Sequence, residues 1–350
     1  MPKYHHNLEV KFIISDETQY YCGISFFKKN VVDQVDVCAN RITISFDRSK
    51  KLNVADAFHS PNSIIRYELQ RALCFYLVVH GTIPDVESII YTCEGKSESI
   101  EHEVFTNTWK NCDISFTLPV EKARVIFESE KGKPFYVIIT HFVKAQLVLF
   151  SHDRFRAAWS ALNGLYTYID SVERSKNSTD SDQYVSEETK ITMLSTVIKE
   201  NDMMLASTKV KKLDAESFWK QLNWYLVLSN LSDKKFRKLN SGLYSDALLL
   251  EYYYQHRSIY NGKKQEKHKD EEWSSIIKKI ERRKKTPIDR LRFLICDYCY
   301  VLRNKSVHAV RPYPLFIISE DVETKIEKTL TEIVLLTIKD LFIVYSGKII

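Results

Sequence analysis

The hydrophobic pattern of this chain changes its period near Pro134, and this change limits the folds that the chain can adopt. Before Pro134, short runs rich in Val, Ile, Tyr and Phe are separated by polar segments, as strands are. After it, apolar residues recur every three to four positions, as they do on one face of a helix. The pattern therefore predicts an α+β region followed by a helical region.

The first region is predicted to hold one helix and several strands. A helical period covers residues 64–79, where Asn53 or Asp56 would open the helix and Gly81 would end it. No glycine-rich phosphate loop, His-x-x-x-His pair or catalytic triad is recognisable here, so the sequence of this region indicates no activity. The strands are expected at 8–15, 19–27, 35–46, 88–93, 113–118 and 125–128.

The second region is predicted to be all helical. Phe135–Phe150 is almost wholly apolar and is interpreted either as a buried strand leading into a helix or as one long helix. Ser175–Ser186 is rich in Ser and Asp and is expected to be a mobile loop. We therefore predict an α+β domain over 1–140 and an all-α helical bundle over 141–350. Helical patterns occur at 153–173, 187–205, 214–231, 242–258, 271–284, 287–310 and 320–346.

Composition favours a soluble protein with a large core, since 44% of residues are hydrophobic and 27% are charged. No secretion signal and no apolar run of membrane-spanning length is found, so we expect a cytoplasmic protein without a membrane partner. Seven scattered cysteines in such a chain do not predict disulfides. The Cys296-x-x-Cys299 pair has no neighbouring metal-ligand pattern, and Cys299 lies on an apolar helix face, so we interpret both thiols as core residues.

The net charge of +6 comes from one segment. Residues 261–292 hold 12 Lys and Arg against 6 Asp and Glu, and this excess accounts for the whole net charge. A basic segment of this kind can contact a phosphate backbone, although it can also be an ordinary solvated surface. The residues predicted to bind RNA are Lys278, Lys279, Arg282, Arg283, Lys284 and Lys285.

A short motif near the C-terminal end combines a fixed cation, an amide and an imidazole. Arg303, Asn304 and His308 lie on the continuation of an apolar helical stripe that begins at Leu291. At about 100° per residue, Asn304 and His308 share one face with Asp297, while Arg303 projects roughly 140° from His308. Asn304 would therefore orient the imidazole, and the two charged groups would flank a groove that suits a phosphate.

This motif, Leu302-Arg303-Asn304-Lys305-Ser306-Val307-His308, resembles the signature of HEPN domains, particularly the Apea-like branch of prokaryotic defence and toxin systems. A second segment, Phe155–Tyr166, is similar to the opening helix of that branch, in which an acidic residue commonly follows a core leucine. Here that position is Asn163, so Asn163 and Asp297 are both candidates for the polar group that supports the Arg/His pair, with Lys305 beside them.

The resemblance implies a helical bundle that dimerises with its Arg/His motifs facing each other. In active members it implies a metal-independent endoribonuclease without cofactors, acting in an anti-phage, toxin or stress system. RNA would then be the substrate, and an antitoxin or trigger protein a possible partner. Residues 1–140 would sense a trigger, recruit substrate or hold the nuclease inactive.

Elementary chemistry agrees with the active form of such a domain. RNA carries its own nucleophile in the 2′-OH, so cleavage needs only a proton-transfer group and a cation at the phosphate, and His308 and Arg303 supply these. Two alternatives stay open. The domain can be an inactive module that binds RNA, a nucleotide or a partner protein, or Arg303 can form a structural ion pair while His308 caps the helix end.

Overall fold

A computed structural model describes residues 4–28, 31–51, 63–101, 112–128, 132–176, 185–213, 217–222, 286–307 and 322–345. The chain forms two compact units. Unit 1 joins Met1–Leu165 with Phe342–Ile350, and unit 2 spans Tyr166–Leu341. The helices α7 (Ser151–Lys176) and α17 (Val322–Tyr345) contribute residues to both. The predicted domains 1–140 and 141–350 stay a prediction, whereas the predicted order of an α+β region and a largely helical region is confirmed.

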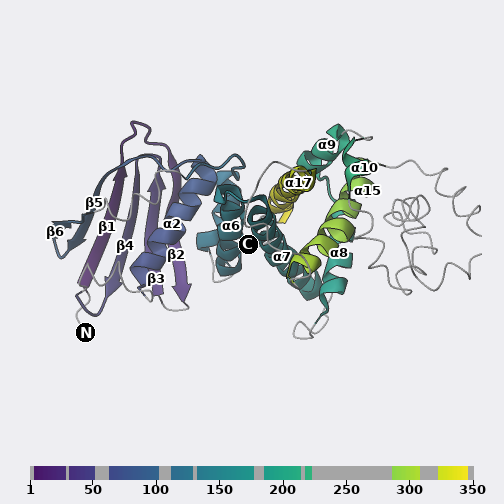
Figure 1. Ribbon diagram of the computed structural model, residues 1–350. Helices are drawn as coiled ribbons and strands as arrows, with labels where there is room; N and C mark the ends of the chain where they lie inside the picture. The colour runs from purple at the N-terminus through teal and green to yellow at the C-terminus, as the bar shows by residue number, and fades with distance from the viewer. Residues whose placement is uncertain are drawn as a thin grey trace, which may run out of the picture. The chain divides into compact units, whose positions relative to one another are not determined.

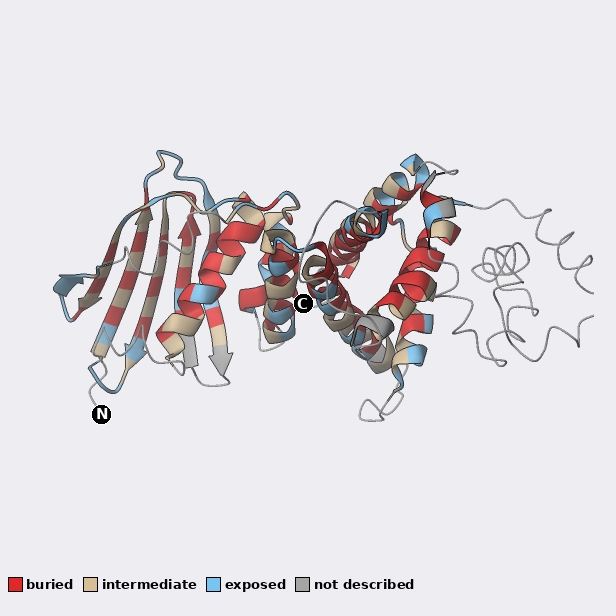
Figure 2. Cartoon of the chain, viewed as in Figure 1, coloured by how far each residue is buried: buried red, intermediate tan, exposed pale blue. Residues whose placement is uncertain are grey.

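Unit 1 is built on one antiparallel sheet of six strands in the order β2-β3-β4-β1-β5-β6 (Figure 1). Apolar side chains of β1 such as Leu8 and Val10 are buried on one face, while Glu9 and Lys11 lie on the other. Figure 2 shows the resulting alternation as bands along the strands. The strands are β1 (Tyr4–Phe12), β2 (Gln19–Lys28), β3 (Val31–Cys38), β4 (Arg41–Arg48), β5 (Val86–Cys93) and β6 (Lys96–Ser99).

The predicted strand over 35–46 is wrong, because this stretch is a hairpin. Its β3 and β4 arms pair Val35 with Ile44 and Val37 with Ile42, and the two-residue turn Ala39–Asn40 joins them. Ala39 is itself buried, so the apolar pattern runs through the turn without the usual Gly or Pro signal.

Helix α2 (Ile64–His80) packs against β3 and β4 and buries the apolar face of the sheet (Figure 1). Gly81 ends it with φ 97°, a left-handed conformation that glycine adopts without strain, so the predicted end is confirmed. The predicted opening at Asn53 or Asp56 is wrong, because the side chain of Ser63 accepts the capping hydrogen bond from the backbone N–H of Arg66.

Residues 113–118 and 125–128 are not the strands that we predicted. The backbone of the first segment bonds to the end of α2, with Ile114 N donating to Gly81 O and Leu118 N to Val78 O, both at 2.8 Å. The β-pairing of segment 113–118 consists of one isolated bridge, between Thr82 and Asp113. Residues 120–128 form two short helices, α4 (Val120–Ala123) and α5 (Val125–Glu128).

Helix α6 (Gly132–Leu147) settles the alternatives for Phe135–Phe150, since the apolar run is helical. Phe135 packs edge-on against Phe342, with ring centroids 5.6 Å apart. Ile138 lies against Gly164 of α7, where an added Cβ would come within 2.8 Å of the Ile138 side chain. Close packing of helices therefore completes the core of unit 1.

Charged side chains are also buried in unit 1, between α2 and the sheet. Glu68 and Arg71 have fully buried side chains, and Arg71 Nη1 lies 3.3 Å from Glu68 Oε1. Ser25 Oγ donates to Glu68 Oε2 at 2.5 Å, and the Arg71 guanidinium sits 5.2 Å from the centre of the Phe127 ring. Burial raises the pKa of Glu68, while Arg71 and the Ser25 hydrogen bond act in the opposite direction.

Unit 2 is helical throughout its described parts. The predicted helix over 187–205 is two helices, α8 (Glu187–Glu200) and α9 (Met204–Lys212), with α10 (Ser217–Gln221) following. The predicted helices over 242–258 and 271–284 and most of the predicted loop over 175–186 lie outside the described residues. In the parts of the chain that are described, no helix is long and apolar enough to cross a membrane.

The start of α9 is stabilised by a distant carboxylate. Asp340 of α17 is buried, and it accepts hydrogen bonds from Leu205 N at 3.2 Å and Ala206 N at 2.9 Å. These donors would otherwise lack partners at a helix N-terminus, so Asp340 acts as a cap supplied from another helix.

We expect Asp340→Ala to lower the free energy of unfolding by about 1–2 kcal/mol, because the N–H groups of half-buried Leu205 and buried Ala206 lose their acceptor. Asp340→Asn keeps one acceptor oxygen and is expected to cost less. Urea unfolding followed by circular dichroism measures both effects. Equal stability of Asp340→Ala and the unaltered protein would show that the cap contributes nothing.

Candidate active site

The helix that carries the motif begins with a well-formed cap. Thr286 Oγ1 donates to Asp289 Oδ2 at 2.7 Å, and Asp289 N donates back to Thr286 Oγ1 at 3.2 Å. Pro287 occupies the first turn, where its missing N–H costs nothing. This capping box starts α15 (Pro287–Arg292), so the predicted start of the helix at residue 287 is confirmed.

The middle of the helix is a π-helix, η3 (Phe293–Cys299), which leads into α16 (Tyr300–Val307). Its hydrogen bonds run from i to i+5, so the 100° per residue that we assumed does not hold across Asp297. Every residue from Leu291 to Cys296 is buried, instead of a single stripe. The helix packs against α8 and α9, and Arg292 Nε donates to Ser195 O at 3.0 Å.

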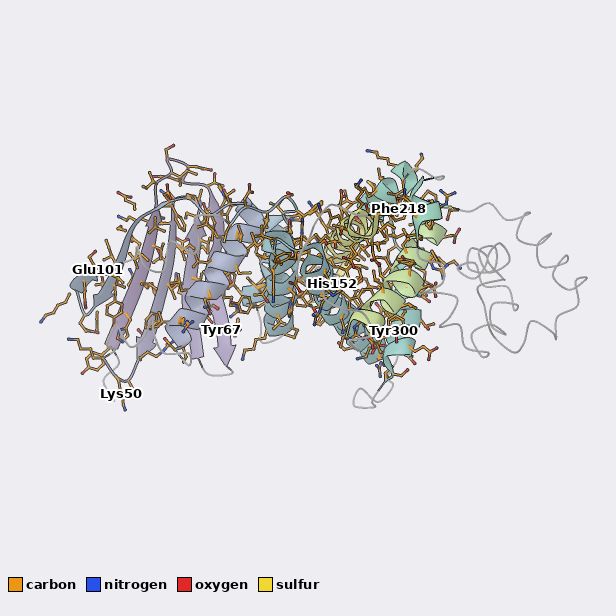
Figure 3. All side chains as sticks on the ribbon, in the orientation of Figure 1. Lys50, Tyr67, Glu101, His152, Phe218 and Tyr300 are labelled. Carbon is orange, nitrogen blue, oxygen red and sulfur yellow. The ribbon has the colours of Figure 1, made fainter. Side chains whose placement is uncertain are left out.

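Arg303 is held by two acceptors on the solvent side of this helix. Its Nη1 donates to Asn304 Oδ1 at 2.8 Å and to Glu187 Oε2 at 3.3 Å. The side chain of Arg303 is 21% exposed and that of Glu187 is 34% exposed. The guanidinium is therefore fixed in position but still reachable from solvent. Figure 3 marks Tyr300, which opens this α16 segment.

Glu187 is held in turn by a buried tyrosine. Tyr166 Oη donates to Glu187 Oε1 at 3.1 Å, so the two carboxylate oxygens bind one partner each. Burial raises the pKa of Tyr166, and the nearby Glu187 carboxylate raises it further, so the phenol keeps its proton and donates. We call Tyr166, Glu187, Arg303 and Asn304 the arginine cluster; three segments of unit 2 build it.

Glu187 is the residue that our sequence reasoning missed. Ser186 caps α8 and Glu187 opens its first turn, so the predicted helix start at residue 187 is confirmed, but no pattern in the sequence linked the Glu187 carboxylate to Arg303. Asn163 and Asp297 were the two residues predicted to support the Arg/His pair. Asn163 is half-buried in unit 1, Asp297 is half-buried in unit 2, and each takes part in interactions. Their role beside the Arg/His pair stays a prediction.

The remaining predicted site residues lie outside the description of the structure. These are His308, the side chain of Lys305, and the basic residues Lys278, Lys279, Arg282, Arg283, Lys284 and Lys285.

The geometry of Asn304 is compatible with a bond to His308. Its carbonyl oxygen accepts from Arg303 Nη1 and has a second lone pair that can accept from an imidazole N–H. An imidazole that donates one N–H to this oxygen keeps its other nitrogen unprotonated, which is the form required of a general base.

Cys296 and Cys299 are buried, and burial raises the pKa of Cys299, as expected of inert core thiols. In the described parts of the chain, no three His, Cys, Asp or Glu side chains come together as metal ligands would. Comparisons with protein-family models, curated proteins and solved structures found no match to this chain.

Proposed function

We propose that unit 2 carries a metal-independent endoribonuclease site of the HEPN type. The observation that supports this most is the arginine cluster, which fixes Arg303 on a partly exposed helix face in the same short motif as His308. A permanently charged, oriented and reachable guanidinium suits a phosphate whose charge grows in the transition state. As in the resemblance described above, two copies of the chain would form the active dimer.

In the proposed reaction, the 2′-OH of RNA attacks the adjacent phosphorus and the 5′-oxygen of the next nucleotide leaves. The products are a 2′,3′-cyclic phosphate and a free 5′-OH. His308 accepts the 2′-OH proton or donates a proton to the leaving oxygen, and Arg303 stabilises the phosphorane-like charge. Asn304 orients His308, and Glu187 with Tyr166 orients Arg303.

One observation favours the alternative of a binding module. The charge of Arg303 is offset by Glu187 in the described structure, which suits a fixed docking group for RNA, a nucleotide or a partner protein as well as it suits catalysis. In that case His308 would not need a particular protonation state. Variants of Arg303 and His308 separate the two functions.

We expect Arg303→Lys to fail in RNA cleavage, because lysine keeps the charge but loses the planar fork that bonds Glu187, Asn304 and the phosphate. The rate should fall by about 10²–10³-fold, the cost of removing one positioned donor to a developing charge. Glu187→Gln keeps an acceptor for Tyr166 or Arg303 and should lose less. The assay incubates purified protein with total RNA in EDTA.

A matched control is available in the ion pair between Lys209 and Glu332, whose side chains are 31% and 38% exposed. Lys209→Gln removes a comparable ion pair of unit 2 outside the arginine cluster and should leave the rate unchanged. Full activity of Arg303→Lys, with the fold intact by circular dichroism, would show that Arg303 is structural.

A further inference from the structure

Arg303 keeps most of its hydrogen-bonding capacity after it joins the arginine cluster. A guanidinium carries five N–H groups, and the two bonds of Arg303, to Glu187 Oε2 and Asn304 Oδ1, both start from Nη1. Among the described residues, its Nε and Nη2 have no hydrogen-bond acceptor. These two atoms form one edge of the guanidinium, and such an edge can bind two oxygens of a phosphate side by side.

The same guanidinium lies beside a fixed negative charge. Glu187 Oε2 is 3.3 Å from Arg303 Nη1, and Tyr166 Oη donates to the other carboxylate oxygen at 3.1 Å. Glu187 therefore cannot turn away from Arg303 without losing its bond to Tyr166. Asn304 is uncharged, and burial raises the pKa of Tyr166, so the phenol is uncharged too. The arginine cluster thus carries one positive and one negative charge, and no net charge.

The phosphates of an RNA differ in charge according to their position. An internal phosphate is a diester with a single negative charge. A terminal phosphate, or that of a mononucleotide, is a monoester and carries a charge of about −1.5 to −2 at pH 7. On the Nε–Nη2 edge of Arg303, the first charge is neutralised by the guanidinium, whereas a second charge also meets the Glu187 carboxylate on the other side of the same group.

This repulsion is large enough to select between the two kinds of phosphate. At an effective dielectric constant of about 20, a unit charge roughly 6 Å from a carboxylate loses affinity by a factor on the order of 100. Solvent screens Glu187, whose side chain is 34% exposed, and reduces the expected factor to about 10.

We propose that Glu187 makes this site selective for the internal phosphodiesters of RNA and against terminal phosphates and mononucleotides. The inference rests on the proposed ribonuclease function, in which Arg303 binds the phosphate that is cleaved. The transition state of cleavage also gains negative charge, but His308 takes up the 2′-OH proton beside it, so a positive charge forms together with the negative one. A terminal phosphate brings its second charge without such a proton. The enzyme therefore cuts within RNA chains and is inhibited little by their phosphorylated ends.

The test compares two uncleavable ligands that differ by one charge, 2′-O-methyluridine 3′-phosphate and its 3′-methyl ester. The full chain is titrated with each at pH 7.5 by calorimetry. The unaltered protein should bind the methyl ester at least as tightly as the monoester. In Glu187→Gln, the affinity for the monoester should rise about 10-fold relative to the methyl ester, because the carboxylate charge is gone.

The matched control is Glu188→Gln. Glu188 follows Glu187 in the first turn of α8, is exposed, and makes no bond to Arg303, so the same change of net charge should leave the ratio of the two affinities as it is. Arg303→Gln should weaken the binding of both ligands. If it binds both normally, the phosphate does not bind at Arg303 and the inference is overturned.

Tyr166→Phe distinguishes the charge of Glu187 from its role in positioning Arg303. This variant removes the hydrogen bond to Glu187 but leaves the carboxylate charge, so the ratio of the two affinities should stay as in the unaltered protein. A ratio that changes as much as in Glu187→Gln would show that position, and not charge, sets the preference, and would overturn the inference.

The outcomes also separate the two proposals. RNA cleavage together with an unchanged affinity ratio in Glu187→Gln overturns the selectivity and leaves the nuclease. The predicted change of ratio without any RNA cleavage overturns the nuclease and leaves a phosphodiester-binding site. An unaltered protein that binds the monoester about 10-fold more tightly than its methyl ester also overturns the selectivity, since Glu187 then does not repel the second charge.

Discussion

RNA cleavage by His308→Ala is expected to be about 10²–10⁴-fold slower than by the unaltered protein, the usual contribution of a general acid–base group. RNA affinity should change little, because the substitution removes a proton-transfer group and leaves the permanent charge of Arg303 at the phosphate. Arg303 and its partners keep their contacts in this variant, so the phosphate still binds. Single-turnover cleavage and filter binding of the same RNA measure the two quantities.

His5→Ala serves as the control for this variant. His5 is an exposed histidine of β1, and its contact with Asp47 is a surface ion pair worth little. The His5→Ala variant should cleave RNA at the same rate as the unaltered protein. If folded His308→Ala cleaves RNA at the normal rate, the nuclease proposal is wrong and the binding module takes its place.

The second large effect is expected in the fold of unit 1. Glu68→Ala should lower the free energy of unfolding by about 3–5 kcal/mol, because it leaves the charge of Arg71 buried without a counter-charge. Ser25 Oγ would also lose Glu68 as its acceptor, and it would keep only its bond from Arg71 Nη1 among these contacts. Arg71 Nη1 would still donate to the oxygens of Ser25 and Phe26, but these are uncharged, and in the described part of the chain Arg71 Nε and Nη2 are buried without a hydrogen-bond acceptor.

The double variant Glu68→Leu with Arg71→Met tests this explanation, because it removes both charges and keeps apolar volume. It should be more stable than Glu68→Ala alone. Glu98→Ala, at an exposed position of β6, is the control and should unfold at the normal urea concentration. A double variant less stable than Glu68→Ala would mean that specific contacts, and not uncompensated charge, stabilise this region.

Much of the first region could be predicted because burial follows a simple period there. The apolar stripe of α2 and Gly81 after it give both the helix and its end. The failures have local causes. Alternation continues through the buried turn at Ala39, and the run at 125–128 is too short to distinguish a strand from a helical turn. The segment at 113–118 bonds to α2, a tertiary contact that no local pattern contains.

The candidate site was predictable only where its residues are neighbours in the sequence. Arg303 and Asn304 were selected because they stand in one short motif, but their hydrogen bond to each other was not predicted, and Glu187 lies 116 residues away from Arg303. The π-helix was missed because its residues also satisfy an α-helical apolar spacing. Buried charges such as Glu68 and Arg71 were missed for the related reason that patterns assign charged residues to the surface.

The central claim is that this chain cuts RNA by using the 2′-OH of the RNA itself. Its most direct test compares one labelled RNA with a copy that carries a single 2′-deoxynucleotide at the preferred cleavage position, both incubated with the full chain in EDTA. The account predicts that the RNA is cut there, leaving a 2′,3′-cyclic phosphate, and that the deoxy copy is intact at that position. Cutting of both at the same rate, or a strict requirement for Mg²⁺, would contradict it.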